Sequence, residues 1–192
     1  VFDYPIFTTN YRYENLIKYY LSKIKIKKYK IILEPFKKNT APAILTSVLI
    51  NEIPKNQPVV FFPSDHFIDK SETFTKKLNK LLTSNQKFLS DDNLFIFGIK
   101  TTFPSTEYGY FLTNKNKKKV DYVYKFVEKP ILQIAKKIIK KKAYWNSGIF
   151  YAKKISIINN FIKYQPNTYK LCLNSVNKSL YKDNSILLNK SF

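Results

Sequence analysis

The feature that most constrains the fold of this chain is a regular alternation of short apolar runs with longer segments of helical spacing. Runs rich in β-branched and aromatic residues predict strands, whereas apolar residues that recur every three or four positions predict helices. We expect strands at residues 5–9, 30–33, 59–62, 94–99, 108–112, 120–127 and 145–151. We expect helices at residues 11–24, 40–50, 70–83, 131–141 and 155–164, and a helical or irregular segment after Asn167. Such alternation is typical of α/β proteins with a mainly parallel sheet.

Two of the expected strands, at residues 59–62 and 94–99, are apolar throughout. Continuous apolar strands are typical of positions that are buried on both faces of a sheet, and we predict this for both strands. The length of 192 residues is sufficient for one domain with a substantial core and hardly for two, so we expect a single domain over residues 1–192. A hydrophobic content of 44% excludes a disordered tail.

The net charge of +21 raises the question of a nucleic-acid partner. Arg12 is the only arginine among 34 basic residues, whereas nucleic-acid sites favour clustered arginines. The lysines are spread along the chain, with local runs at residues 23–30, 115–119 and 136–142. The excess of Lys, Asn, Ile, Tyr and Phe is typical of A/T-rich codons. We therefore expect no specific nucleic-acid binding, and a basic nucleic-acid-binding domain is the weaker alternative.

Cysteine content and hydropathy limit which classes of protein remain possible. Cys172 is the only cysteine, which excludes an internal disulfide and a thiolate metal cluster. The longest uncharged apolar-rich run, at residues 41–50, is too short to cross a bilayer, and no signal peptide opens the chain. We expect a cytoplasmic protein with no membrane partner. Because the chain begins at Val1 and contains no methionine, we also expect it to be part of a longer protein.

Polar residues follow three of the expected strands, as Glu34-Pro35, residues 63–66 and residues 128–130. Ligands of open α/β sheets bind beyond the carboxyl ends of the strands, so this rim is the expected ligand site. Asp65 is a candidate Mg²⁺ ligand, because Mg²⁺ takes one or two carboxylates together with phosphate oxygens; capping of the next helix is the alternative. Asn39 and Thr40, with Lys38 beside them, start a helix and offer a corner for an anion or a base, or an ordinary N-cap.

Further candidates lie on the later strands. Gly109 within a strand indicates either the close approach of a ligand or a bulge with aromatic packing. Glu128 and Lys129 could meet sugar hydroxyls and a phosphate if the strand ends before them, or form an edge-strand charge pair. Asn146 and Ser147 are polar residues in an otherwise apolar strand, and their partner is either a sugar or the backbone.

Taken in this order and spacing, these motifs closely resemble the mannose-1-phosphate guanylyltransferases, which are GDP-mannose-forming members of the nucleotide-diphospho-sugar transferase family. The resemblance covers nearly the whole chain. It is carried by LEP at residues 33–35, NTAPA at 39–43, PSDH at 63–66, FVEKP at 126–130 and WNSGIF at 145–150. Thr9 and Asn10, which precede the first helix, fit the same pattern.

The resemblance implies a Rossmann-like three-layer fold around a central mixed, mainly parallel sheet that is incomplete at both ends. It implies an enzyme that joins mannose 1-phosphate to GTP and releases pyrophosphate with the help of Mg²⁺. By resemblance, Asp65 matches the metal ligand, and Asn39 and Thr40 match the segment beside the nucleotide base. Residues around the sugar and its phosphate are matched by Gly109, Glu128, Asn146 and Lys129. A homo-oligomer is compatible with this family.

The chain also departs from the family. It carries Lys37-Lys38 where the family has Gly-Arg, and Glu107 where the family has a turn glycine. The family's Gly-rich triphosphate loop, with its Arg and Lys, and its second metal-binding Asp have no match in these 192 residues. We therefore expect no catalytic residue within this segment and no turnover by the segment alone. The alternatives are a non-catalytic remnant that binds sugar nucleotides and a nucleotidyltransferase for another sugar phosphate.

Overall fold

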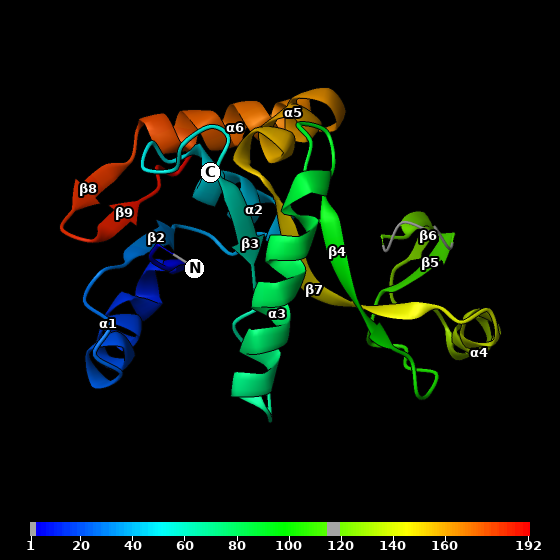
Figure 1. Cartoon of the computed structure of the whole chain (residues 1–192). Coiled ribbons are helices and arrows are strands. Elements are labelled where there is room, and N and C mark those ends of the chain that lie inside the picture. Colours follow the sequence, from blue (N-terminus) through cyan, green and yellow to red (C-terminus); the bar gives the residue numbers. More distant parts are fainter. Residues whose placement is uncertain (1–2, 115–119) are drawn as a thin grey trace. The chain divides into compact units, whose positions relative to one another are not determined.

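The computed structural model describes residues 3–114 and 120–192, and the expected lysine-rich turn at 115–119 lies outside them (Figure 1). The chain divides into two compact units. Unit 1 comprises Val1–Val59, Asp69–Leu94 and Ala152–Phe192, and unit 2 comprises Val60–Ile68 and Phe95–Tyr151. The single domain expected over residues 1–192 stays a prediction, because two compact units can belong to one domain.

A four-stranded sheet forms the centre of unit 1, in the order β1-β2-β9-β8. Its strands are β1 (Ile6–Asn10), β2 (Lys30–Glu34), β9 (Ser185–Leu187) and β8 (Leu180–Lys182). β2 is parallel to both β1 and β9, whereas β8 is antiparallel to β9. The prediction of an α/β fold with a mixed, mainly parallel sheet is therefore confirmed for this unit.

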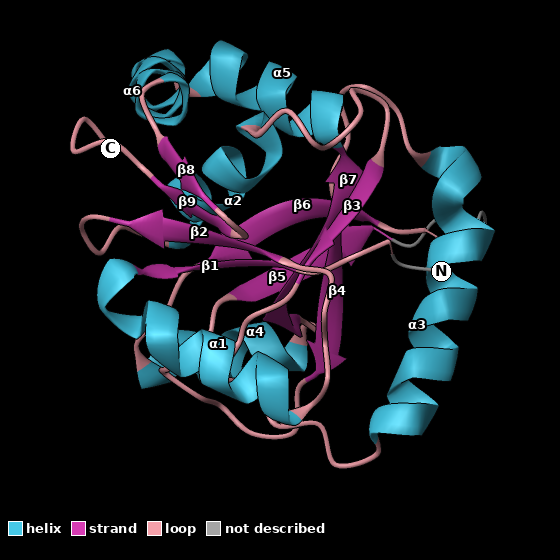
Figure 2. Ribbon diagram, turned by 90° about the vertical axis from the view of Figure 1, so that its left-hand side faces the viewer, coloured by secondary structure: helices cyan, strands magenta, loops and turns pink. Residues whose placement is uncertain are grey.

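Helices cover both faces of this sheet. On one face, Leu21 of α1 (Glu14–Lys23) forms a buried cluster with Ile31 and Leu33 of β2. On the other face lie α2 (Thr40–Leu49), α5 (Lys154–Tyr164) and α6 (Pro166–Asn177), which contact one another. Figure 2 shows α1 on one side of β1 and β2, with these three helices on the opposite side. A short 3-10 helix (Tyr11–Tyr13) precedes α1. α3 (Ser71–Asn85) and a second 3-10 helix (Gln86–Phe88) complete the helical segments of the unit.

The sheet to which unit 2 contributes has the order β3-β7-β5-β6, and β4 also pairs with β7. Its strands are β3 (Pro58–Phe61), β4 (Phe95–Lys100), β5 (Tyr110–Asn114), β6 (Tyr122–Val127) and β7 (Tyr144–Lys153). β4 and β5 are antiparallel to β7, and β6 is antiparallel to β5. α4 (Leu132–Lys140) packs Ala135 and Ile138 against Tyr110 and Trp145. These contacts form the buried core of the unit.

The burial that the sequence predicted for two strands is wrong. β3 is half-buried along its whole length, and β4 is exposed from Gly98 to Lys100, so neither strand is buried on both faces. β3 lies at one end of the order β3-β7-β5-β6, and β4 lies off this order with β7 as its one partner strand among the described pairings. The segment after Asn167 is more regular than expected, since α6 is followed by the β8–β9 hairpin that completes the sheet of unit 1. Within residues 3–114 and 120–192, no helix combines the length and the apolar character needed to cross a membrane.

Candidate functional site

Three of the residues expected around a sugar come together in unit 2. Gly109 directly precedes β5, Glu128 directly follows β6, and Asn146 belongs to β7. Because Tyr110 pairs with both Val127 and Trp145, the residues next to these pairs are also neighbours. The Asn146 backbone N–H donates a hydrogen bond to the Gly109 carbonyl over 2.8 Å. Strand pairing therefore assembles this group, which we call the sugar-side group: Gly109, Glu128, Lys129 and Asn146.

Gly109 is buried and has no room for a side chain. A Cβ atom built on it would lie 2.7 Å from Oε2 of Glu128 and 3.0 Å from Cζ of Phe126. Gly109 thus allows the Glu128 carboxylate and the Phe126 ring to approach the backbone closely. The carboxylate of Glu128 lies against the backbone directly before β5, and the residue as a whole remains exposed.

Glu128 and Lys129 satisfy the condition under which both could reach one ligand. β6 ends at Val127, so the alternation of side chains across the sheet does not continue through these two residues. The φ angle of Lys129 is +37°, a left-handed conformation that non-glycine residues rarely adopt and that turns the backbone sharply. Pro130 is buried directly after this turn, whereas Glu128 and Lys129 are both exposed. Their carboxylate and ammonium groups are therefore available to a ligand.

Asn146 and Ser147 differ in how their side chains are satisfied. The Ser147 hydroxyl donates to the Phe97 carbonyl over 2.7 Å and accepts from the Ile149 N–H over 3.2 Å, so the backbone is its partner. Oδ1 of Asn146 accepts from the Gly148 N–H over 3.1 Å. Among the described residues, the Nδ2 group of Asn146 donates no hydrogen bond. This amide therefore has a donor to offer to a ligand.

Asp65 belongs to the same unit and lies in the exposed segment that follows β3. Pro63 belongs to this segment, and its Cγ atom would lie 2.9 Å from a Cβ built on Gly148. Among the described residues, no group of three or more His, Cys, Asp or Glu side chains could hold a metal ion. Asp65 thus offers a single carboxylate. Such a donor fits Mg²⁺ where phosphate oxygens and water complete the coordination.

The residues expected beside a nucleotide base lie in unit 1. Lys38, Asn39 and Thr40 are all exposed, and α2 begins at Thr40. Asn39 occupies the N-cap position, but its side chain makes no capping hydrogen bond. An ordinary N-cap would accept a hydrogen bond from the first turn of the helix, so this alternative from the sequence does not hold for Asn39. Its side chain and the first-turn N–H groups remain available to a polar ligand.

Glu34 is a candidate that the sequence analysis did not single out as a site residue. It ends β2 with only 8% of its surface exposed, and its Oε1 atom has no hydrogen-bond partner within the described structure. Burial raises the pKa of the Glu34 carboxyl to about 7. Burial, together with the nearby Glu34 charge, also raises the pKa of the Cys172 thiol to about 11, and the charge of Lys38 opposes this effect. A glutamate that follows three apolar strand residues was the available signal.

The end of β2 is also tied to the end of β1. The two strands pair in register up to Asn10 and Glu34, and Nδ2 of Asn10 donates to the Glu34 carbonyl over 3.2 Å. Oδ1 of Asn10 accepts from the Arg12 N–H over 3.2 Å and so caps the 3-10 helix. Both side-chain groups of Asn10 thus bond to backbone, which gives this residue a structural role at the end of the two strands.

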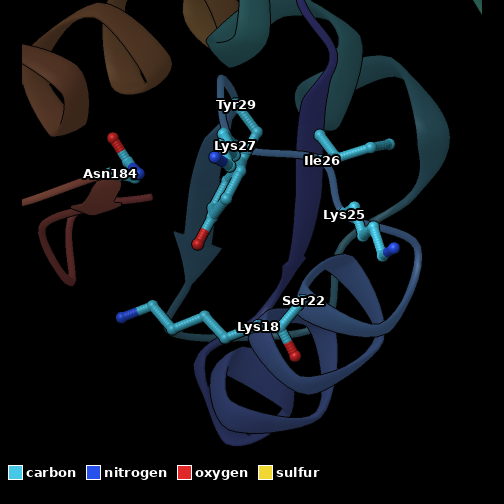
Figure 3. A pocket seen from close by; sticks show the side chains of 7 residues that line it. All are labelled: Lys18, Ser22, Lys25, Ile26, Lys27, Tyr29 and Asn184. Atoms are coloured by element: carbon cyan, nitrogen blue, oxygen red, sulfur yellow. The ribbon is translucent and has the colours of Figure 1, made fainter.

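A cavity of about 430 Å³ in unit 1 contains none of the predicted site residues (Figure 3). It lies at the end of α1, and its lining residues are Lys18, Ser22, Lys25, Ile26, Lys27, Tyr29 and Asn184. Lys18 forms an ion pair with Glu14 over 2.6 Å, and Glu14 also accepts from Ser185. Cations near the carboxyl end of a helix are stabilised by the helix dipole. The position of the lysines at the end of α1 is therefore explained by the stability of the helix.

The α/β fold places several polar residues at strand ends, which is where ligands of such folds bind. Residues 2–187 match the nucleotidyl transferase family, and the chain belongs to this family. A mannose-1-phosphate guanylyltransferase from Escherichia coli is 36% identical over 162 residues, covering 80% of this chain and 34% of that protein. An alginate biosynthesis protein AlgA from Pseudomonas fluorescens is 28% identical over 182 residues, covering 92% of this chain and 37% of that protein. The chain thus spans little more than a third of the length of these curated relatives.

Solved structures agree with the family assignment at the level of the fold. A structure described as mannose-1-phosphate geranyltransferase from Thermus thermophilus matches with a TM-score of 0.76 and 19% identity, over 95% of this chain and 58% of that one. A structure described as mannose-6-phosphate isomerase from Helicobacter pylori matches with a TM-score of 0.81 and 26% identity, over 96% of this chain and 72% of that one. The resemblance inferred from the sequence motifs is therefore confirmed.

Proposed function

We propose that this chain is part of a sugar-phosphate nucleotidyltransferase that joins mannose 1-phosphate to GTP and releases pyrophosphate. The observation that carries the proposal is the sugar-side group of unit 2, where Gly109, Glu128 and Asn146 are neighbours through strand pairing. A carboxylate that accepts and an amide that donates are the complementary partners of sugar hydroxyls. The relatives named mannose-1-phosphate guanylyltransferase support mannose as the sugar and GTP as the nucleotide.

The proposed reaction needs no serine, cysteine or histidine nucleophile. A phosphate oxygen of mannose 1-phosphate attacks the α-phosphorus of GTP, the bond from this phosphorus to the bridging oxygen breaks, and pyrophosphate leaves. Positioning the two substrates in line and offsetting their negative charge supply most of the catalysis. Glu128 and Asn146 orient the sugar, and Lys129 offsets the charge of its phosphate.

Mg²⁺ is part of the proposal, with Asp65 as its protein ligand, and when bound it would offset charge on the phosphates. Lys38, Asn39 and Thr40 are proposed to contact the nucleotide. Their exposure, and the uncapped first turn of α2, support this role. Because anions and polar ligands favour the amino end of a helix, the start of α2 is a suitable place for the nucleotide.

Pyrophosphate release by the full-length protein tests the proposal. GTP should be preferred over ATP, UTP and dTTP, and mannose 1-phosphate over glucose 1-phosphate. Asp65→Asn should lower kcat by about a hundredfold through loss of metal-dependent charge stabilisation. Glu128→Gln should raise the KM for mannose 1-phosphate by about tenfold and leave the KM for GTP unchanged. The matched control is Glu72→Gln, which changes an exposed glutamate in the first turn of α3.

Three results would contradict the proposal. Equal use of UTP or dTTP would indicate another nucleotidyltransferase, and equal use of glucose 1-phosphate would indicate another sugar phosphate. Retention of sugar-nucleotide binding without any turnover in the full-length protein would indicate a non-catalytic binding module. An unchanged KM for mannose 1-phosphate in Glu128→Gln would remove Glu128 from the sugar contacts.

A further inference from the structure

The cavity of unit 1 that Figure 3 shows is lined by three segments of the chain. They are the last turns of α1, the connection from α1 to β2, and the turn between β8 and β9, which lies near the other end of the chain. All three segments belong to unit 1. None of the residues proposed to contact the nucleotide, the sugar phosphate or Mg²⁺ lines this cavity. The proposed reaction therefore makes no use of it.

The lining of the cavity is basic and includes no acidic residue. Figure 3 shows the side-chain ends of Lys18, Lys27 and Tyr29 around one space. Asn184 lies beside this space, whereas Lys25 points away from it. Two ammonium groups, a phenolic hydroxyl and an amide thus lie at one cavity, and all of them can donate hydrogen bonds to an anion.

The positive charge at the cavity is only partly compensated. In the lysine run at residues 23–30, the lysines that do not line the cavity each have a partner: Lys23 lies over the Tyr19 ring, Lys28 pairs with Asp3 and Lys30 pairs with Glu52. Lys25 and Lys27 form no ion pair with a carboxylate in the described part of the chain. The dipole of α1 acts within the last turn of the helix and so does not account for Lys27, which lies beyond the end of α1.

The backbone around the cavity is held by hydrogen bonds. The N–H groups of Lys25 and Ile26 donate to carbonyls of the last turns of α1 over 3.1 and 3.0 Å, as is common where a helix ends. These bonds occupy carbonyl groups that would otherwise repel an anion. On the other side of the cavity, the Asn184 carbonyl accepts from the Ile31 N–H over 2.8 Å. The donors are therefore carried by ordered backbone, which lowers the entropic cost of binding a ligand.

We propose that this cavity binds a small anion that carries a phosphate group, with Lys27, Lys18 and the Tyr29 hydroxyl as its donors. Ammonium and hydroxyl groups are complementary to the charged oxygens of phosphate. Lys18 can take part while it keeps its ion pair with Glu14, because an ammonium group has three donors. The inference goes beyond the proposed function and does not depend on it.

The anion has two possible sources, which are free inorganic phosphate and the phosphate group of a larger organic molecule. The cavity volume of about 430 Å³ leaves room for an organic part beside the phosphate. Ile26 and the ring of Tyr29 are half-buried and pack against the core cluster of α1 and β2, so they offer a firm apolar surface to such a part. A comparison of inorganic phosphate with a sugar phosphate distinguishes the two sources.

Titration calorimetry of inorganic phosphate into the full-length protein, at physiological salt, tests the proposal. One phosphate should bind per chain at this cavity. Lys27→Gln should raise the Kd at least about tenfold, since one charge-assisted hydrogen bond is lost, and Lys27→Arg should restore most of the affinity. The matched control is Lys77→Gln, which removes the same charge from an exposed position of α3 and should bind as the wild type does.

The same titration with mannose 6-phosphate, which is not a substrate of the proposed reaction, identifies the source of the anion. Tighter binding of mannose 6-phosphate than of phosphate would support the proposal with an organic phosphate as the ligand. Tighter binding of inorganic phosphate would support it with the free anion. In either case, Lys27→Gln should weaken the binding of the preferred ligand, and Lys77→Gln should not.

Three outcomes would overturn the proposal. The first is that neither ligand binds to the wild type, a result that needs no variant. The second is an equal loss of affinity in Lys27→Gln and Lys77→Gln, which would assign binding to the net charge alone. The third is a loss in Lys129→Gln without a loss in Lys27→Gln, which would place the phosphate at the sugar-side group. Pyrophosphate release in phosphate-free buffer should be the same in Lys27→Gln as in the wild type, so a failure of the proposed function would be seen separately.

Discussion

Replacing Glu34 by glutamine should stabilise the folded protein near pH 8 and have little effect on its stability at pH 4.5. Burial raises the pKa of this carboxyl from 4.5 to about 7. The folded state therefore holds the proton more tightly than the unfolded state does. The stability associated with the protonated group is complete below pH 4.5, decreases as the pH rises through this interval, and is lost above about pH 7.

The size of the effect follows from the same two values. At about 1.4 kcal/mol per pH unit, a pKa that rises from 4.5 to about 7 corresponds to about 3 kcal/mol of folding free energy. Glutamine is isosteric and cannot ionise, so the variant should gain up to this amount at pH 8. The neighbouring thiol of Cys172, with its pKa at about 11, stays neutral between pH 5 and 8. It therefore adds no slope to the comparison.

Urea unfolding of the nucleotide-free full-length protein at pH 5, 6, 7 and 8 measures this difference. The gap between Glu34→Gln and the wild type should widen with pH up to about pH 7 and then stay constant. Glu72→Gln, at an exposed position, should follow the wild type at every pH. A gap that stays the same from pH 5 to pH 8 would refute the reasoning, because it would mean that Glu34 titrates alike in the folded and the unfolded chain.

Two glycines in unit 2 give further predictions. In Gly109→Ala the new Cβ would lie 2.7 Å from Oε2 of Glu128 and 3.0 Å from the Phe126 ring. The flexible carboxylate should move, so steady-state kinetics should show a KM for the sugar phosphate raised by about tenfold, and an unchanged KM would contradict this. Gly148→Ala combines a φ of +69° with a Cβ only 2.9 Å from Cγ of Pro63. Denaturant unfolding should show a loss of about 1–3 kcal/mol, and a wild-type midpoint would disprove the strain.

The sequence predicts the strands near Gly109, Glu128 and Asn146, and the structure adds the pairing that makes these residues neighbours. Gly109, Glu128 and Asn146 each lie at or next to a strand whose pattern is clear, and antiparallel pairing of neighbouring strands makes them adjacent. The end of β6 before Glu128 is also predictable, since Pro130 follows two residues later. Local signals were sufficient for the strands, while the role of these residues at a sugar stays a prediction.

The remaining features depend on contacts that no local pattern encodes. The Glu34 charge acts on Cys172 of α6, which lies far along the chain, so the surroundings of Glu34 include a segment that no local pattern indicates. β8 and β9 have three residues each, which is too short for a periodicity to be recognised. The apolar sequences of β3 and β4 do not indicate that β3 ends the pairing order and that β4 pairs with β7 outside it, so the burial of both strands was overestimated.

Glu34 stands out most clearly against the other buried polar groups of unit 1. The hydroxyls of Thr46, Ser156 and Ser175 are fully buried, and each donates to a backbone carbonyl. The buried hydroxyl of Ser185 donates to the Glu14 carboxylate instead, so each of these four hydroxyls has a partner within the unit. Among the described residues, two further buried side-chain atoms lack a partner, Asn79 Oδ1 and Trp145 Nε1, but both are neutral. An unpaired charged oxygen costs more than an unpaired neutral one, so Glu34 is the group of these three whose burial should make stability most dependent on pH.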